Sequence, residues 1–203
     1  GLGLSEDQLV TYFGDTPMSR TKLINYPPAP QGQAGVNAHH DTGFLTLLAT
    51  GEVPGLQVQN SAGEWVDVPP HPDGLVVNLG ELLQAMTGNY FVATAHRVIA
   101  PRRRRSAAYF HGPSLDARLD PLPLDESFAA TVAASERHVS AGFMAQRDET
   151  DAGVADMASR HRPDTYGEQL WNYFARSYPN LMARYASTGT VVQSSPGKTS
   201  SSD

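Results

Sequence analysis

Residues 44–79 read FLTLLATGEVPGLQVQNSAGEWVDVPPHPDGLVVNL, and this stretch indicates the fold class. It contains four short apolar runs, and each is closed by glycine, proline, asparagine or serine. The expected strands are residues 44–49, 56–59, 65–68 and 75–79. Many short strands at this spacing are typical of an antiparallel sandwich or barrel.

The strand pattern continues on both sides of this stretch. Residues 22–26 are apolar enough for a strand, and the prolines that follow cannot continue a hydrogen-bonded ladder. Residues 95–99 and 106–111 complete the set. The chain is therefore expected to be mainly β, with helices at its flanks.

The expected helices lie outside or between these strands. A short helix after Ser5 should end near Gly14, and residues 81–87 suit a brief helical turn. Residues 165–185 carry apolar side chains at helical spacing, with a break expected at Pro179. Residues 128–135 fit a strand or a helix equally well. We expect residues 1–186 to form one domain core and residues 187–203, rich in Ser, Thr and Gly, to be disordered.

The composition excludes several classes of protein. The chain has 203 residues, of which 40% are hydrophobic and 18% charged, as in globular domains. It has no apolar run long enough for a membrane helix, no signal peptide at its start and no cysteine. We therefore expect a cytoplasmic protein without a membrane partner. A net charge of -6 argues against a nucleic-acid partner. The four arginines at residues 102–105 are the one basic run that could favour such a partner.

A possible metal site is the most specific chemical feature. His39 and Asp41 are two residues apart, so on an extended strand both side chains point to one face, and His40 points away. His96 lies in a second expected strand. Two imidazoles and one carboxylate form the facial triad of non-haem Fe(II) oxygenases, which leaves three coordination positions open. Taken alone, the His-x-Asp pair is explained better by a hydrogen bond that serves packing.

A possible carboxylate anchor follows the second histidine. Arg104 and Ser106 are again two residues apart, so they share one strand face, and Arg103 and Arg105 face the other way. Arginine binds a carboxylate through two donors, and a serine hydroxyl adds a third. Arg102, Arg103 and Arg105 are expected to be solvent-exposed.

These motifs resemble the isopenicillin N synthase-like branch of the Fe(II)/2-oxoglutarate-dependent dioxygenases. The matching segments, in order, are KLINYPP (22–28), AHHDTGFLTLL (38–48), PGLQV (54–58), VNLGELLQAMT (77–87), HRV (96–98) and R-x-S (104–106). The resemblance covers about residues 5–113. It implies a double-stranded β-helix, also described as a distorted jelly roll, which agrees with the strand count.

The resemblance also implies roles for individual residues. His39, Asp41 and His96 become the ligands of Fe(II) and the catalytic centre, and Arg104 and Ser106 become the anchors of 2-oxoglutarate. Tyr26 matches a tyrosine that in relatives donates to the same carboxylate, and an ordinary aromatic at a strand end explains it equally well.

Other positions are less decisive. Asn78 is either close to the site or a turn-capping asparagine, and His40 and His111 are expected at the surface or behind the ligands. Phe44 and Phe110 are either pocket walls or core aromatics. Where relatives have aspartate after Asn-x-Gly, this chain has Glu81.

The implied activity couples the oxidative decarboxylation of 2-oxoglutarate, with O2, to hydroxylation or a related oxidation of a small-molecule substrate. Relatives carry further N-terminal residues, so the N-terminal part of the usual domain is expected to be absent here.

Three other functions compete with this one. The nearest is an Fe(II) oxidase of the same fold that does not use 2-oxoglutarate, since such relatives keep the Arg-x-Ser pair for another carboxylate. The second is a catalytically idle jelly-roll binding module, which the intact triad disfavours. The third is a hydrolytic zinc site, which the motif order and the lack of a nearby general-base motif disfavour. The sequence leaves the substrate and the oligomeric state open.

Overall fold

The computed structural model describes residues 2–30, 33–135, 164–180 and 182–183 of the chain. Its contacts divide the chain into two units, Gly1–Glu168 and Gln169–Asp203. All the strands and the candidate site belong to the first unit, and the second unit is described by itself. The expected disordered tail, residues 187–203, lies outside the described residues.

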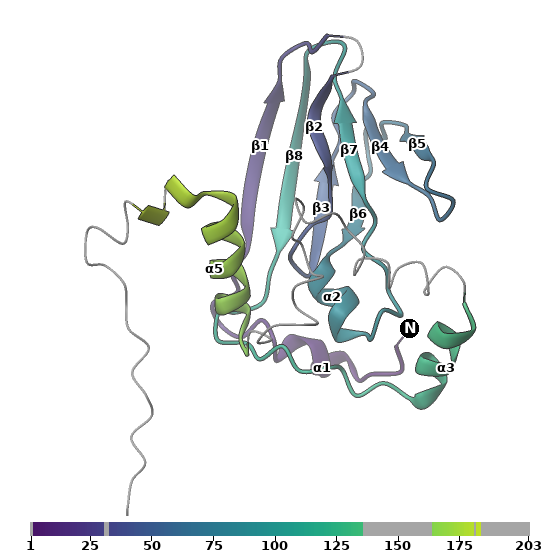
Figure 1. Ribbon diagram of the computed structural model, residues 1–203, viewed down its shortest axis with the longest axis vertical. Helices are drawn as coiled ribbons and strands as arrows, with labels where there is room; N and C mark the ends of the chain where they lie inside the picture. The colour runs from purple at the N-terminus through teal and green to yellow at the C-terminus, as the bar shows by residue number, and fades with distance from the viewer. Residues whose placement is uncertain (1, 31–32, 136–163, 181, 184–203) are drawn as a thin grey trace, which may run out of the picture. The chain divides into compact units, whose positions relative to one another are not determined.

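Two antiparallel four-stranded sheets make up the described strands of the chain (Figure 1). Sheet I has the order β1-β8-β3-β6, and sheet II has the order β2-β7-β4-β5. The strands are β1 (Arg20–Tyr26), β2 (Ala34–His39), β3 (Leu45–Ala49), β4 (Leu56–Gln59), β5 (Trp65–Val68), β6 (Val76–Leu79), β7 (His96–Ile99) and β8 (Arg104–His111).

Apolar side chains from both sheets form one core. Its buried members are Tyr26, Leu48, Leu56, Val98, Ala100 and Ala108, and Ile24, Val36, Val68, Val76 and Phe110 pack against them. Since these residues alternate with exposed ones along their strands, each sheet turns one face toward the other. The two facing antiparallel sheets confirm the mainly β, jelly-roll fold class expected from the sequence.

The expected strands agree with the observed ones to within two residues at every end. β4 and β5 match their expected bounds, and β1 and β8 each begin two residues earlier than expected. The exception is β2, because no strand was expected over residues 34–37. β2 pairs with β7 through two register shifts, and its burial alternates only weakly.

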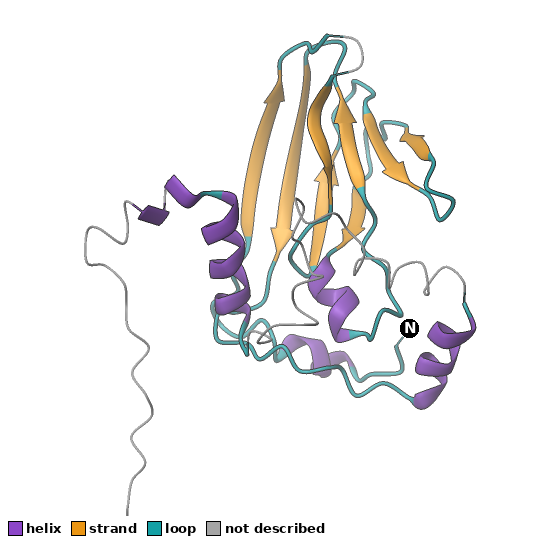
Figure 2. Cartoon of the chain, in the orientation of Figure 1, coloured by secondary structure: helices purple, strands orange, loops and turns teal. Residues whose placement is uncertain are grey.

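The three described helices that lie wholly within the first unit are outside the two sheets, at the ends of their strands or beyond (Figure 2). Helix α1 (Glu6–Val10) follows Ser5, whose side chain makes no capping hydrogen bond. Helix α2 (Glu81–Met86) joins β6 to the segment before β7, as expected. Helix α3 (Glu126–Ala134) settles the open choice at residues 128–135, because Asp125 caps it by accepting from the Ser127 N–H at 2.9 Å.

Helix α5 (Tyr166–Ser177) crosses the boundary between the two units. It ends before Pro179, where the sequence predicted a break, and a further short helical stretch begins there. Within the described residues, no helix has the length and apolar content needed to cross a membrane.

Candidate metal centre and carboxylate anchor

The three residues expected to bind metal lie together at adjoining strand ends. His39 is the last residue of β2, His96 is the first residue of β7, and the two are paired across the strands. Asp41 follows β2 in the loop to β3. Residues more than fifty positions apart in sequence are thus brought together by the pairing within sheet II.

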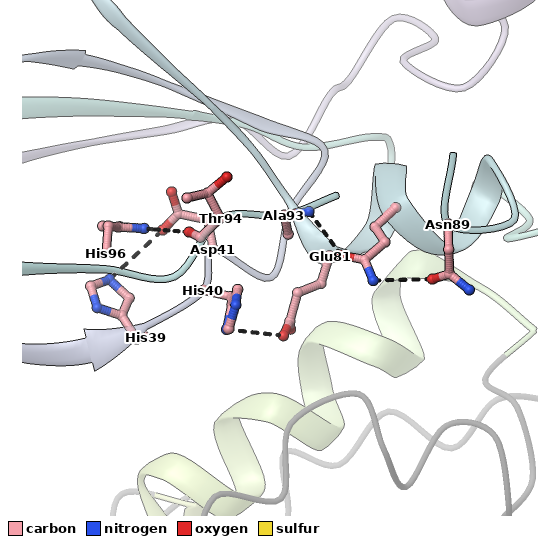
Figure 3. A network of polar contacts seen from close by, with 9 residues as sticks. His39, His40, Asp41, Glu81, Asn89, Ala93, Thr94 and His96 are labelled. Atoms are coloured by element: carbon pink, nitrogen blue, oxygen red, sulfur yellow. Dashed lines mark hydrogen bonds and ion pairs between the residues drawn. The ribbon is translucent and has the colours of Figure 1, made fainter. Parts of the chain in front are cut away.

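The ligand atoms of this group converge on Asp41 (Figure 3). The Oδ1 atom of Asp41 is 3.9 Å from His39 Nε2 and 3.8 Å from His96 Nε2. One ligand atom from each of the three residues lies within 4.8 Å of the others. The Nε2–Oδ1 separations are too long for hydrogen bonds, so packing through a His–Asp hydrogen bond does not explain the arrangement.

The position of Asp41 differs from the expected one. The sequence placed His39 and Asp41 on one strand, whereas β2 ends at His39. Asp41 lies in a loop because its carbonyl accepts a hydrogen bond at 2.8 Å from the Glu81 N–H, at the start of α2, and not from a neighbouring strand. The side chains of His39 and Asp41 still meet, as expected.

Both imidazoles are oriented by the backbone. His39 Nδ1 is 2.9 Å from the Asn37 carbonyl oxygen, and His96 Nδ1 is 3.1 Å from the Thr94 carbonyl oxygen. A carbonyl oxygen only accepts, so each Nδ1 must carry a proton and donate it. The lone pair of each ring then lies on Nε2, the atom that faces Asp41, which is the tautomer a metal requires.

Asp41 has a buried carboxylate oxygen that the described residues leave unsatisfied. Asp41 is 6% exposed, and within the described residues its Oδ2 has no hydrogen-bond partner. Burying an unpaired carboxylate oxygen is costly, and a divalent cation would remove that cost. Burial and the neighbouring His96 lower the pKa of His39, which favours the neutral, ligating form. The donor set therefore fits Fe(II), for which two histidines and one carboxylate are typical ligands.

Helix α2 holds the loop that carries Asp41. The three N–H groups at its start donate to three carbonyls of this loop, Gly80 to Phe44, Glu81 to Asp41 and Leu82 to Gly43, at 2.9, 2.8 and 3.2 Å. A Cβ atom on Gly80 would lie 1.9 Å from the Gly43 oxygen, so only glycine allows this approach. Three backbone hydrogen bonds thereby tie the loop to the start of α2.

One buried contact behind the ligands could not be predicted from the sequence. His40 Nδ1 lies 3.9 Å from Glu81 Oε1, and the two side chains are 7% and 5% exposed (Figure 3). His40 was expected either at the surface or behind the ligands. The surface position is wrong, because His40 lies behind the ligands. Glu81 stood out in the sequence only as a departure from the usual aspartate, and no local signal linked it to His40.

The expected carboxylate anchor is a buried arginine. Arg104, the first residue of β8, is 2% exposed. Its Nε donates to the Val53 carbonyl at 3.2 Å and its Nη2 donates to the Thr50 carbonyl at 3.1 Å. Within the described residues it has no carboxylate partner, and a buried charge without a counter-ion is strongly destabilising. Arg104 is therefore suited to an anion supplied by a ligand.

Two further polar groups adjoin this arginine. Ser106 is 8% exposed and shares the inner face of β8 with Arg104. The Tyr26 hydroxyl lies 3.3 Å from Ser106 Oγ, and the Tyr26 ring lies 5.0 Å below the Arg104 guanidinium carbon. The structure thus brings all three predicted anchor residues together. Tyr26 belongs to this cluster by its hydroxyl and to the core by its ring.

A tight loop places the two carbonyls that hold Arg104. Gly55 closes this loop with a φ of 140°, and a Cβ atom there would lie 2.0 Å from the Ile99 oxygen. The Gly55 carbonyl accepts from the Ile99 N–H at 2.8 Å, which ties the loop to β7. The PGLQV motif, residues 54–58, therefore helps to fix the orientation of the anchor.

The remaining residues singled out in the sequence are placed as follows. Arg102, Arg103 and Arg105 are exposed, as expected. Asn78 is buried within β6 and paired with Thr46, so it is not a turn-capping residue.

Comparison with known proteins gives the family. A sequence model described as the 2OG-Fe(II) oxygenase superfamily matches residues 6–113, which is more than half of the chain. The chain belongs to this superfamily. The matched region begins at α1 and ends just after β8, so it contains the candidate metal centre and the anchor.

The sequence of the chain is similar to those of two named enzymes. It is 29% identical over 215 residues to the 2-oxoglutarate-dependent dioxygenase frbJ of Dothideomycetidae sp. (strain 11243), an alignment that covers 96% of the chain and 57% of that protein. It is 40% identical over 127 residues to 1-aminocyclopropane-1-carboxylate oxidase 3 of Arabidopsis thaliana, covering 59% of the chain and 39% of the oxidase. The chain therefore spans less than two thirds of either relative.

Solved structures of superfamily members share the fold. A full-length Neurospora crassa protein, in complex with alpha-KG and thymine, aligns with a TM-score of 0.58 and 28% identity, over 63% of this chain and 43% of the Neurospora protein. JOX2, in complex with 2OG, Fe and JA, aligns with a TM-score of 0.56 and 33% identity, over 60% of this chain and 38% of JOX2. These neighbours support the double-stranded β-helix assignment.

Proposed function

We propose that the chain is the core of a non-haem iron oxygenase that couples the oxidative decarboxylation of 2-oxoglutarate to hydroxylation, or a related oxidation, of a small-molecule substrate. The observation that carries this proposal is the pairing of two incomplete sites in one barrel. Among the residues that the structure describes, one site has a buried carboxylate with an unsatisfied oxygen beside two Nε2 atoms, and the other has a buried guanidinium without a carboxylate partner.

In this proposal His39, Asp41 and His96 bind Fe(II) and form the catalytic centre. Arg104 and Ser106, with the hydroxyl of Tyr26, bind the distal carboxylate of 2-oxoglutarate through charge-assisted hydrogen bonds. When bound, the metal and the co-substrate supply the oxidising chemistry, as O2 is consumed and 2-oxoglutarate is converted to succinate and CO2. The protein contributes orientation, because the anchor fixes one end of the co-substrate relative to the triad.

An Fe(II) oxidase of the same fold is the second candidate. It is favoured by the 40% identity to a 1-aminocyclopropane-1-carboxylate oxidase. In that case Arg104 and Ser106 would bind the carboxylate of another ligand. Both candidates require the same iron ligands, so only dependence on 2-oxoglutarate separates them.

Anaerobic titration tests the proposal. Fe(II) is added to the protein, followed by 2-oxoglutarate, and the visible charge-transfer band of the chelate is recorded. We expect a band that is lost in His96→Ala and needs far more 2-oxoglutarate in Arg104→Ala. The exposed Arg105, changed to alanine in a matched variant, should leave the band unchanged. One iron bound per chain without any band would exclude 2-oxoglutarate and favour the oxidase, and failure to bind iron would overturn both candidates.

Several properties stay predictions. These are the small-molecule nature of the substrate, the absence of a nucleic-acid partner and a cytoplasmic location. Identification of the product by mass spectrometry tests the first. A nucleic-acid binding assay and fractionation of cells that make the protein test the other two.

A further inference from the structure

The inner face of β1 carries two cations in line with the anchor. β1 and β8 run antiparallel side by side (Figure 1), with Arg20 opposite Phe110, Lys22 opposite Ala108 and Tyr26 opposite Arg104. Directly paired residues lie on the same face of a sheet. Since Tyr26 and Arg104 are buried on the inner face, Arg20 and Lys22 are directed to that face too.

Arg20 is held in place by two aromatic residues. Its guanidinium carbon lies 4.8 Å from the centroid of the Phe110 ring, and its side chain interacts with the Tyr166 hydroxyl. Tyr166 is 2% exposed, and a Cβ atom on Gly43 would lie 3.6 Å from this hydroxyl. Gly43 is only two residues from Asp41. Arg20 is therefore ordered close to the loop that carries a proposed iron ligand.

Lys22 lies between Arg20 and Tyr26 along β1, opposite Ala108, and its side chain is exposed. Within the described residues, neither Lys22 nor Arg20 forms an ion pair with a carboxylate, whereas Arg118 pairs with Asp120 at 2.9 Å. Arg20 and Lys22 lie two residues apart on one face of β1, so their charges repel each other, and an anion between them would remove that repulsion.

The order of these residues along β1 separates two carboxylate sites. The anchor cluster lies at the Tyr26 end, and Arg20 lies six residues away at the other end, beyond Lys22. A co-substrate fixed at Arg104 extends toward the triad, so it leaves the Arg20 end of the barrel for the second reactant. Phe110 adds an apolar surface beside the Arg20 guanidinium there.

We propose that Arg20 and Lys22 bind a carboxylate of the molecule that is oxidised, so that the substrate is a small organic acid with an apolar body. This inference rests on the proposed function, because it assigns the substrate class of the same site. It adds a second carboxylate-binding group to the barrel, distinct from the anchor at Arg104. The carboxylate would be held through charge-assisted hydrogen bonds, and the apolar body would lie against Phe110.

Paramagnetic relaxation tests this inference without knowledge of the natural substrate. The chain is loaded with Mn(II) and saturating 2-oxoglutarate, and the ring-proton relaxation of phenylacetate is compared with that of its neutral analogue phenylacetamide. We expect stronger relaxation of phenylacetate. In Arg20→Gln/Lys22→Gln its affinity should fall about tenfold or more, the effect of losing charged hydrogen bonds. Arg20→Lys should retain part of the binding.

The matched control is Arg105→Gln, which removes a positive charge from the outer face of β8. It should leave the relaxation of phenylacetate unchanged. Equal relaxation of the two probes, or an equal effect of Arg105→Gln and the double variant, would overturn the inference. Absence of the Fe(II)·2-oxoglutarate charge-transfer band in the wild-type protein would instead overturn the proposed function. Retention of that band in the double variant shows that it is folded.

Discussion

Glu81 lies behind the metal centre, facing His40, with 3.9 Å between Oε1 of Glu81 and Nδ1 of His40. Both side chains are nearly buried, and His40 stands in sequence between two of the proposed ligands. The backbone N–H of the same glutamate donates to the carbonyl of Asp41 at 2.8 Å. One residue of α2 therefore contacts the ligand loop through both its backbone and its side chain.

Removal of this side chain should weaken metal binding without abolishing it. In Glu81→Ala the backbone bond to Asp41 stays, but the contact of His40 with the Glu81 carboxylate is lost and the ligand loop becomes less constrained. We expect the affinity for Mn(II) or Fe(II) to fall about tenfold, as for other residues that support ligands from behind. Calorimetric titration measures this change. Glu81→Asp, which introduces the aspartate common at this position in the family, should recover most of the metal affinity. Equal affinities of the wild type, Glu81→Ala and Glu81→Asp would refute a supporting role for the Glu81 side chain.

The glycine at the start of α2 should be irreplaceable for steric reasons. In Gly80→Ala the new Cβ would be forced against the Gly43 oxygen, 1.9 Å away, so α2 and the loop must separate. We expect the free energy of unfolding to fall by about 2 kcal/mol or more, with weaker metal binding because Asp41 moves. Chemical denaturation and metal titration measure the two effects.

The matched control for this variant is Gly88→Ala. Gly88 has a φ of 59°, but nothing lies within 4 Å of a Cβ atom there. Its cost is conformational alone, about 1 kcal/mol, and its metal affinity should be unchanged. A Gly80→Ala protein no less stable than Gly88→Ala would show that the close approach is not required.

The sequence was sufficient for most of the strands because local residues mark their ends. Turn-forming residues follow both strands directly. Residues 60–63 follow β4, and Pro69 and Pro70 follow β5. β2 lacks such marks. Its residues Ala34, Gly35 and Asn37 have little preference for a strand, and it forms because β7 offers an edge.

For the candidate site, the spacing of residues along a strand could be predicted from the sequence, but contacts between separate elements could not. Alternation along a strand was enough to place Arg104 and Ser106 on one buried face. It could not show that Glu81 lies against His40, because that contact depends on where α2 begins relative to the loop after β2. The same holds for Arg20 and Tyr166, which are far apart in sequence and have no shared motif.

The contribution of the Tyr26 hydroxyl can be measured directly. Tyr26→Phe keeps the ring in the core and below Arg104 but removes the group that lies 3.3 Å from Ser106 Oγ. If the hydroxyl helps to bind the carboxylate, the 2-oxoglutarate concentration for half-saturation should rise about fivefold, the effect of one hydrogen bond. Titration of the charge-transfer band measures it. An unchanged half-saturation concentration would assign Tyr26 to packing alone.

His111 should make folding stability depend on pH. Its ring stacks on Phe13, with centroids 4.1 Å apart, and burial lowers its pKa below the ordinary 6.5. As the pH falls through 6.5, the unfolded chain takes up a proton at this residue before the folded protein does. Stability should therefore decrease as the pH falls through 6.5 and below, until the folded protein is protonated too. NMR titration of the imidazole gives the folded pKa, and denaturation at several pH values gives the stability. The dependence should be reduced in His111→Gln; an unreduced dependence, or a folded pKa at or above 6.5, would refute this account.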